Sequence, residues 1–190
     1  MEAGTRDRMI DAAIRLLATR GLQGASIAEV LELAEAPRGS VYHHFPGGKD
    51  ELIAAALERA ARRSLDQLAG LDGHPARDVA DRFFASWRTL LTRTHYRAGC
   101  SVLAVTVAAD SAALLDAAGG VFTAWQRRLA ELFASGGMDA GTAAQQATAL
   151  LAISEGAVVL CRAERSLAPL DHAAAVFATQ LEGAPATRPR

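Results

Sequence analysis

Cysteine and aromatic residues are scarce in this chain of 190 residues, and each scarcity excludes a class of protein. The two cysteines, Cys100 and Cys161, lie far apart and form no C-x-x-C motif. This excludes a disulfide-rich scaffold and the usual structural zinc site, so we expect no metal and no cofactor. Aromatic residues make up 5% of the chain, whereas apolar residues make up 51%. Much of that apolar content is alanine, which favours closely packed helices.

Long apolar runs and an excess of one charge are also missing. The charged, amphipathic N-terminus contains no apolar signal core. The longest apolar stretch, residues 147–161, is interrupted by polar side chains and is too short to cross a bilayer. These features predict a cytoplasmic protein with no membrane partner. The formal net charge is -1, and residues 1–64 contain as many basic as acidic side chains, so bulk charge alone does not indicate DNA binding.

Apolar periodicity predicts an all-helical fold of about nine helices. Glycine, proline and capping residues mark the expected helix ends. The valine-rich segment at residues 100–109 has the composition of a strand, but in this setting we expect a short buried helix. The other helices are expected at about residues 5–20, 26–34, 38–45, 49–71, 76–94, 111–134, 142–165 and 169–182.

The stretch that begins at Ser26 has the pattern of a helix-turn-helix. Ser26 followed three residues later by Glu29 is a capping box. Pro37 cannot continue the first short helix but suits the first turn of the next. Val41 and Phe45 are four residues apart and would anchor the second helix to the core, which leaves its other side chains outward. The second helix of such a motif enters the DNA major groove.

Residues 5–60 resemble the DNA-binding domain of the tetracycline-repressor (TetR) family of transcriptional regulators. Three segments carry the resemblance: SIAEV from Ser26, RGSVYHHF from Arg38 and KDEL from Lys49. It implies a homodimeric repressor that binds double-stranded operator DNA in successive major grooves. It also implies a ligand-binding domain of about six helices that dimerises through its last two.

The expected organisation is a helix-turn-helix DNA-binding domain at residues 1–48, a helical ligand-binding and dimerisation domain at 49–182, and a disordered tail at 183–190. Beyond residue 70 the chain matches the TetR family only in length and helical rhythm. One closer similarity, around Gly99, is to the subgroup of regulators that control multidrug-type efflux genes.

Seven residues are expected to contact DNA. Arg38 can grip guanine with two hydrogen bonds, Ser40 can reach a base edge, and Gly39 allows close backbone approach. Hydroxyl, imidazole and ammonium groups suit phosphate contacts, which position the protein without reading sequence. These belong to Ser26, Tyr42, His43 and Lys49. Two alternatives stay open, because Ser26 also suits a plain helix cap and Tyr42 a half-buried core position.

Two further sets of side chains are candidates for a ligand pocket and a dimer face. Aromatic side chains with a few polar groups are typical of a small-molecule site, and here they comprise Phe83, Phe84, Trp87, Cys100, Phe122, Trp125 and Glu155. Such a site predicts a small, largely apolar effector. We expect it to release the DNA, although the residues themselves leave open whether it releases or promotes binding. The expected dimer face comprises Leu150, Ala157, Val158, Cys161, Val176 and Phe177. For both sets, an ordinary intramolecular core is the alternative.

Two other functions are alternatives to DNA binding. An enzyme would need Cys100 or Cys161 as nucleophile and His95 or His172 as base. No glycine-rich turn, paired acids or oxyanion arrangement surrounds either cysteine, so we do not expect catalysis. An all-helical interaction module without sequence-specific DNA binding fits the neutral charge balance and stays open.

Overall fold

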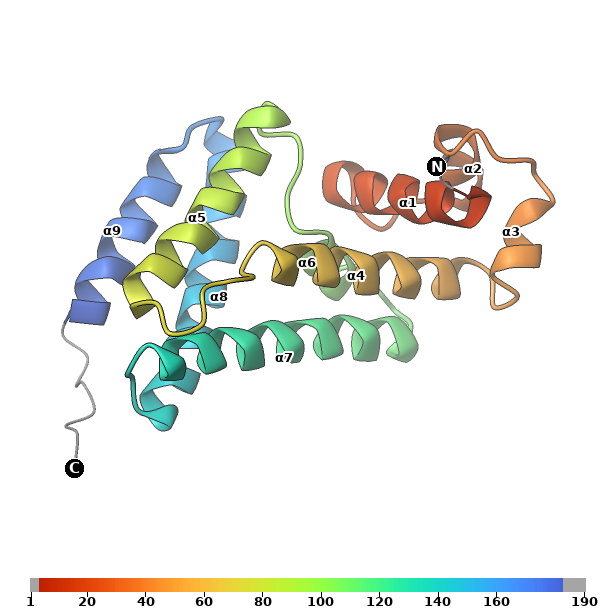
Figure 1. The fold of residues 1–190 in the computed structure, drawn as a ribbon. Coiled ribbons are helices and arrows are strands. Elements are labelled where there is room, and N and C mark those ends of the chain that lie inside the picture. The colour runs from red at the N-terminus through yellow and green to blue at the C-terminus, as the bar shows by residue number, and fades with distance from the viewer. Residues whose placement is uncertain (1–3, 183–190) are drawn as a thin grey trace. The chain divides into compact units, whose positions relative to one another are not determined.

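The computed structural model describes residues 4–182, and within that range the chain forms helices and no β-strand. The expected tail, residues 183–190, lies outside the described residues. Figure 1 shows the nine helices that this range contains. They are α1 (Thr5–Arg20), α2 (Ile27–Leu33), α3 (Ser40–His44), α4 (Lys49–Asp66), α5 (Ala76–Arg93), α6 (Ser101–Thr106), α7 (Ala112–Ser135), α8 (Ala140–Glu164) and α9 (Ala168–Glu182). The predicted all-helical class and helix number are therefore confirmed.

The chain forms two compact units. Unit 1 comprises Met1–Arg63 and Cys100–Phe122, and unit 2 comprises Ser64–Gly99 and Thr123–Arg190. The unit boundaries therefore fall near the end of α4, at the start of α6 and in the middle of α7. The functional domains expected at residues 1–48 and 49–182 stay a prediction, because packing units and functional domains need not share boundaries.

In unit 1, α1 provides the central apolar face. Its buried residues recur at helical spacing and are Met9, Ile10, Ala12, Ala13, Leu16 and Leu17. The helix ends where Gly21 adopts a φ of 74°, a conformation that glycine adopts without steric penalty. α2 and α6 both pack against α1. The helical expectation for the valine-rich segment is confirmed, because that segment forms α6.

The turn between α2 and α3 is longer than the sequence indicates. The second helix was expected from Arg38, but α3 begins at Ser40. The backbone N–H and the hydroxyl of Ser40 both donate to the carbonyl of Pro37, at 3.0 and 2.6 Å. These bonds close a turn before the helix, so the two residues after Pro37 belong to the turn. Within the same connection Glu35 has a φ of 50°.

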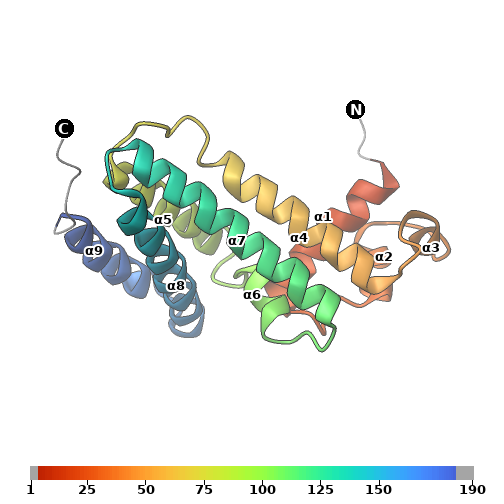
Figure 2. The same cartoon turned by 90° about the horizontal axis from the view of Figure 1, so that it is seen from below.

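In unit 2, α5, α8 and α9 pack together, as Figure 2 also shows. The rings of Phe84 and Phe177 meet edge to face, with centroids 6.3 Å apart. Arg88 of α5 forms an ion pair with Asp171 of α9. By length and composition α8 could cross a membrane, but 50% of its most apolar stretch of 18 residues is buried inside the protein. It also buries Glu155, so we interpret it as a core helix.

The loop between α4 and α5 is fastened to the C-terminal end of α7, within unit 2. Arg128 donates two parallel hydrogen bonds to the carboxylate of Asp72, at 3.0 and 2.8 Å. Paired donation of this kind is the strongest geometry for an arginine and a carboxylate, and the hydrogen bonds from Arg128 lower the pKa of Asp72. The backbone N–H of Gly73 also donates to the hydroxyl of Ser135, at 3.0 Å.

Candidate nucleic-acid interface

α3 is a short helix that is anchored to the core of unit 1 on one side and exposed to solvent on the other. Val41 and Phe45 are 1% and 0% exposed, so they anchor the helix as their four-residue spacing predicts. Tyr42, between them, is 61% exposed, and His43 is exposed beside it. This arrangement presents polar and aromatic groups on a rigid support, as a reading helix requires.

The seven expected DNA-contacting residues all belong to unit 1, but they differ in exposure and in the hydrogen bonds that they already form. Arg38, Gly39, Tyr42 and His43 are exposed. Ser26 is half-buried and completes the capping box of α2, where its hydroxyl oxygen accepts from the backbone N–H of Glu29 at 3.2 Å. Its plain capping role is therefore present, and phosphate binding by Ser26 stays a prediction.

Lys49 is positioned by a contact that the sequence does not reveal. It is the first residue of α4, and its Nζ donates to the carbonyl oxygen of Leu22 at 3.2 Å. Leu22 lies in the loop between α1 and α2. The bond holds the long side chain in one place, so less conformational entropy would be lost when the ammonium group meets a phosphate.

Two acidic side chains of α1 are paired with arginines of α4. Arg59 of α4 pairs with Asp7 and Asp11 of α1, and Arg63 also reaches Asp11, at 2.8 Å. The hydrogen bond from Arg59 lowers the pKa of Asp7. Arg38, by contrast, forms no ion pair with any side chain in residues 4–182. Arg38 is therefore available to an external partner such as a phosphate or a base edge.

The candidate ligand-pocket residues are mostly buried, and they divide between the units. Cys100 and Phe122 belong to unit 1, and the other five belong to unit 2. Five of the seven are buried, while Trp87 and Phe122 are partly exposed. The buried ones are Phe83, Phe84, Trp125, Cys100 and Glu155. The indole Nε1 of Trp87 is buried and has no hydrogen-bond acceptor among the described residues.

Five of the six expected dimer-face residues are buried within the single chain. Leu150, Ala157, Val158, Cys161 and Phe177 are between 0% and 5% exposed, whereas Val176 is 64% exposed. Burial raises the pKa of the Cys161 thiol, so this group stays protonated and weakly reactive at neutral pH.

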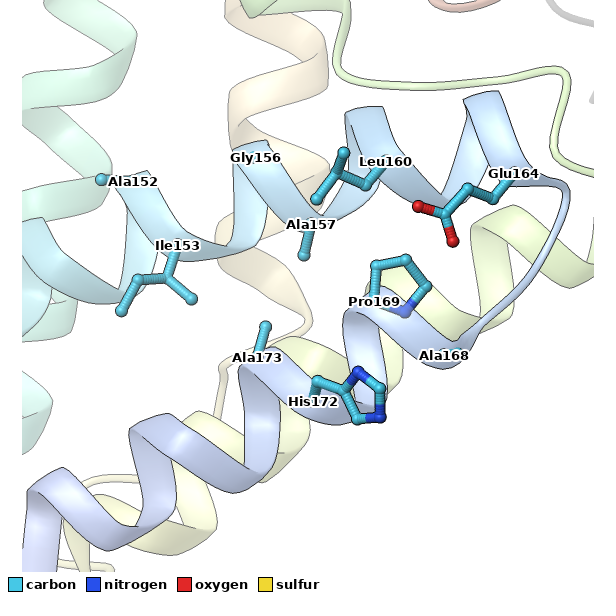
Figure 3. A pocket seen from close by; sticks show the side chains of 10 residues that line it. All are labelled: Ala152, Ile153, Gly156, Ala157, Leu160, Glu164, Ala168, Pro169, His172 and Ala173. Atoms are coloured by element: carbon cyan, nitrogen blue, oxygen red, sulfur yellow. The ribbon is translucent and has the colours of Figure 1, made fainter.

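An apolar groove of about 490 Å³ lies between α8 and α9, close to those buried positions. Figure 3 shows its lining, which is mostly aliphatic. The side chains that project into it include Ile153 and Leu160 from α8 and Pro169 and His172 from α9. Leu160 is 52% exposed in the single chain. No sequence signal locates this groove, because α8 is apolar on several faces and its buried face is set by tertiary packing.

Comparison with known proteins gives two family matches that together cover most of the chain. Residues 9–56 match the model described as bacterial regulatory proteins, tetR family. Residues 75–176 match the model for the C-terminal domain of LmrA/YxaF-like transcriptional regulators.

Full-length relatives and solved structures agree with these matches. An uncharacterised HTH-type transcriptional regulator of Mycobacterium tuberculosis is 33% identical over 175 residues, which covers 88% of this chain and 89% of that protein. The HTH-type transcriptional repressor NemR of Escherichia coli is 27% identical, with 92% of each chain covered. The structure of a regulatory protein TetR from Rhodobacter sphaeroides aligns with a TM-score of 0.81 at 28% identity, over 92% of this chain and 97% of that one.

Proposed function

This chain belongs to the TetR family of bacterial transcriptional regulators, and on that premise we propose that it is a homodimeric repressor. Two copies would bind a palindromic operator, and a small, largely apolar effector would release them. The observation that carries the proposal is the surface of α3, where Arg38, Tyr42 and His43 are exposed over two buried anchors. The matched domains are those of regulators, which gives the enzyme alternative no support.

Repression is proposed rather than activation because a repressor is among the relatives that cover nearly the whole chain. NemR is described as a repressor and covers 92% of this chain. A bound dimer in the path of polymerase represses without needing any further contact surface. We also propose that the protein acts in the cytoplasm, where its DNA target lies.

Dimerisation is supported by the physical limits of one short reading helix. α3 has five residues, so one copy can reach only a few base pairs. Two copies on a two-fold axis would read two half-sites about 34 Å apart, or a multiple of that distance. The apolar groove between α8 and α9, with exposed Leu160 and Val176 on the same two helices, is the surface that a second copy would cover.

The effector site is proposed among the aromatic side chains of unit 2. Phe83, Phe84 and Trp125 supply apolar area, and the buried Nε1 of Trp87 would donate to an acceptor on the effector. The additional roles expected for Cys100 and Phe122 stay predictions, as does the link to efflux genes. A thermal-shift screen of aromatic and apolar compounds tests the proposal. Stabilisation by none of them would contradict it.

A binding experiment separates this function from an interaction module that does not read DNA. The purified protein is titrated into the duplex upstream of its own gene and into a random duplex of equal length. We expect tighter binding to the upstream duplex, with affinity for both that falls steeply as salt rises. Equal binding to both duplexes at every salt concentration would contradict a sequence-specific regulator.

A further inference from the structure

We propose that Arg6, the second residue of α1, is a further contact to the DNA backbone, which rests on the DNA binding proposed above. The guanidinium carbon of Arg6 lies 5.0 Å from the centroid of the Phe45 ring, and Phe45 is the C-cap residue that directly follows α3. Figures 1 and 2 both place the N-terminal end of α1 at the end of unit 1 where α3 lies. Arg6 is therefore a neighbour of the reading helix, although it is far from it in sequence.

The contact with Phe45 fixes the guanidinium without using its hydrogen-bond donors. Phe45 is 0% exposed, so its ring is a rigid platform. A cation held over a ring interacts through its face. The N–H donors of Arg6 lie in the guanidinium plane and stay available to the planar array of oxygens that a phosphate presents. Arg6 itself is exposed to solvent, so a phosphate could reach it.

The charge of Arg6 is only weakly compensated, because its Coulombic interaction with Asp7 is the smallest of the causes that shift the pKa of Asp7. No ion pair joins Arg6 to a side chain in residues 4–182. Its acidic neighbour, Asp7, pairs with Arg59 instead. Several other arginines of unit 1 are engaged in ion pairs, namely Arg20, Arg59, Arg62 and Arg63. Arg6 therefore resembles Arg38 in forming no ion pair and differs from the arginines of α4.

A purely structural role for Arg6 would depend on its stem and not on its charge. If Arg6 only covers the Phe45 ring, a methionine would serve as well, because it has a similar length and also packs well against an aromatic ring. If Arg6 meets phosphate, methionine removes the contact while the cover is retained. Arg6→Met and Arg6→Lys therefore separate the two roles.

Arg15 provides a matched control on the same helix. It is exposed and forms no ion pair with the described residues. Arg15 is nine residues after Arg6, and at about 100° per residue this offset amounts to about two and a half turns, so the two side chains lie on opposite faces. Arg15→Met removes the same unit of charge from the chain without touching the neighbourhood of Phe45.

The test measures the affinity of the full-length protein for two duplexes across a series of salt concentrations. One duplex is selected from a random library by the wild-type protein, and the other is random. We expect Arg6→Met to weaken binding to both by a similar factor, on the order of tenfold at low salt. Its salt slope should fall by about one for each copy of the chain. Arg6→Lys and Arg15→Met should both keep slopes close to that of the wild type.

Three results would overturn the assignment. They are an Arg6→Met slope equal to the wild-type slope, an Arg15→Met loss as large as that of Arg6→Met, and a loss confined to the selected duplex. Circular dichroism and thermal melting check the fold of every variant, and Arg6→Gln replaces Arg6→Met should the latter aggregate. Wild-type protein that never prefers its selected duplex would instead contradict the proposed function as a whole.

Discussion

Two cationic side chains near α3, those of Arg38 and Lys49, differ in how they are held by the rest of the chain. Arg38 is exposed and forms no ion pair with any described residue, so it is free to turn toward a base edge. Lys49 is held by its bond to the carbonyl of Leu22, which gives it a fixed position at the start of α4. An exposed, unpaired arginine suits sequence reading, whereas a fixed ammonium suits a contact that sets the position of the protein.

Replacing these two cations should therefore have different effects. We expect Arg38→Ala to reduce the preference for the selected duplex over random DNA by about 1–3 kcal/mol for each half-site. Lys49→Ala should weaken binding to both duplexes alike and lower the salt slope by about one per copy. Fluorescence anisotropy measures both effects, with Arg62→Ala as an exposed control that is paired with Glu58. Equal losses on the two duplexes for Arg38→Ala would remove Arg38 from base reading.

At the scale of elements, Gly136 allows the chain just after α7 to pack closely against the α4–α5 loop. A Cβ added at Gly136 would lie 2.2 Å from the carbonyl oxygen of His74 in the α4–α5 loop. Real contacts of that kind are never so short, and the neighbour is backbone, so the loop itself would have to move. The same loop is held in place by the two hydrogen bonds from Arg128 to Asp72 and by the hydrogen bond from the Gly73 N–H to Ser135.

Two glycine substitutions should consequently change stability in opposite directions. We expect Gly136→Ala to lower the free energy of unfolding by roughly 1–3 kcal/mol, as overpacking does elsewhere. Gly119→Ala is the control, since Gly119 is exposed on α7 and its added Cβ would meet nothing within 4 Å. It should raise the free energy of unfolding by about 0.5–1 kcal/mol. Urea denaturation measures both, and a neutral Gly136→Ala would show that the loop yields easily.

Element ends were predictable where the cap is a familiar residue and less so elsewhere. The capping box of Ser26 and Glu29 is visible in sequence and is present in the structure. The start of α6 is capped by the sulfur of Cys100, which accepts from the backbone N–H of Leu103 at 3.3 Å. Cysteine is not among the usual capping residues, so composition could not indicate this role.

At the scale of the whole molecule, several carboxylates link stability to pH. Hydrogen bonds from Arg59, Ser26, Arg128 and Thr142, respectively, are the largest causes that lower the pKa of Asp7, Glu29, Asp72 and Asp139. A carboxyl group whose pKa is lower in the folded chain stabilises that chain above its ordinary pKa. This contribution is lost as pH falls through the lowered value. The ordinary values are 3.8 for aspartate and 4.5 for glutamate.

We therefore expect the urea midpoint to be nearly constant from pH 7 to about pH 5 and to fall below about pH 4. Asp7→Asn should flatten part of that decline, because the variant has no carboxylate for Arg59 to hold ionised. Glu32→Gln is the control, since Glu32 is exposed on α2 and has no ion pair within residues 4–182. An Asp7→Asn variant with the full wild-type decline would show that this pair does not contribute.

Apolar periodicity identifies most of the core from the sequence. It does not show which apolar rows of a helix pack within the chain and which would face a second copy. Leu150 and Leu160 both lie on α8 and are chemically identical, yet Leu150 is 0% exposed and Leu160 is 52% exposed. Which row faces the chain's own helices depends on the rotation of α8 against α5 and α9, and that is a tertiary property. Of the six residues expected at the dimer face, Val176 differs from the other five because the single chain leaves it 64% exposed.

The dimer face is best tested through a side chain that the single chain does not need. Leu160→Glu places a charge in the groove between α8 and α9, where Leu160 is half exposed. The fold should tolerate it, because surface substitutions usually change stability by less than about 0.5 kcal/mol. A charge buried against a second copy would be far more costly. Val107→Glu is the control, because Val107 is 74% exposed in unit 1.

We expect light scattering at micromolar concentration to give about twice the chain mass of 19.9 kDa for the wild type and for Val107→Glu. Leu160→Glu should give the mass of one chain and should lose the preference for a palindrome. It should still bind a single half-site as the wild-type chain does, since α3 is unchanged. A Leu160→Glu variant that remains a dimer would place the contact between copies elsewhere on the molecule.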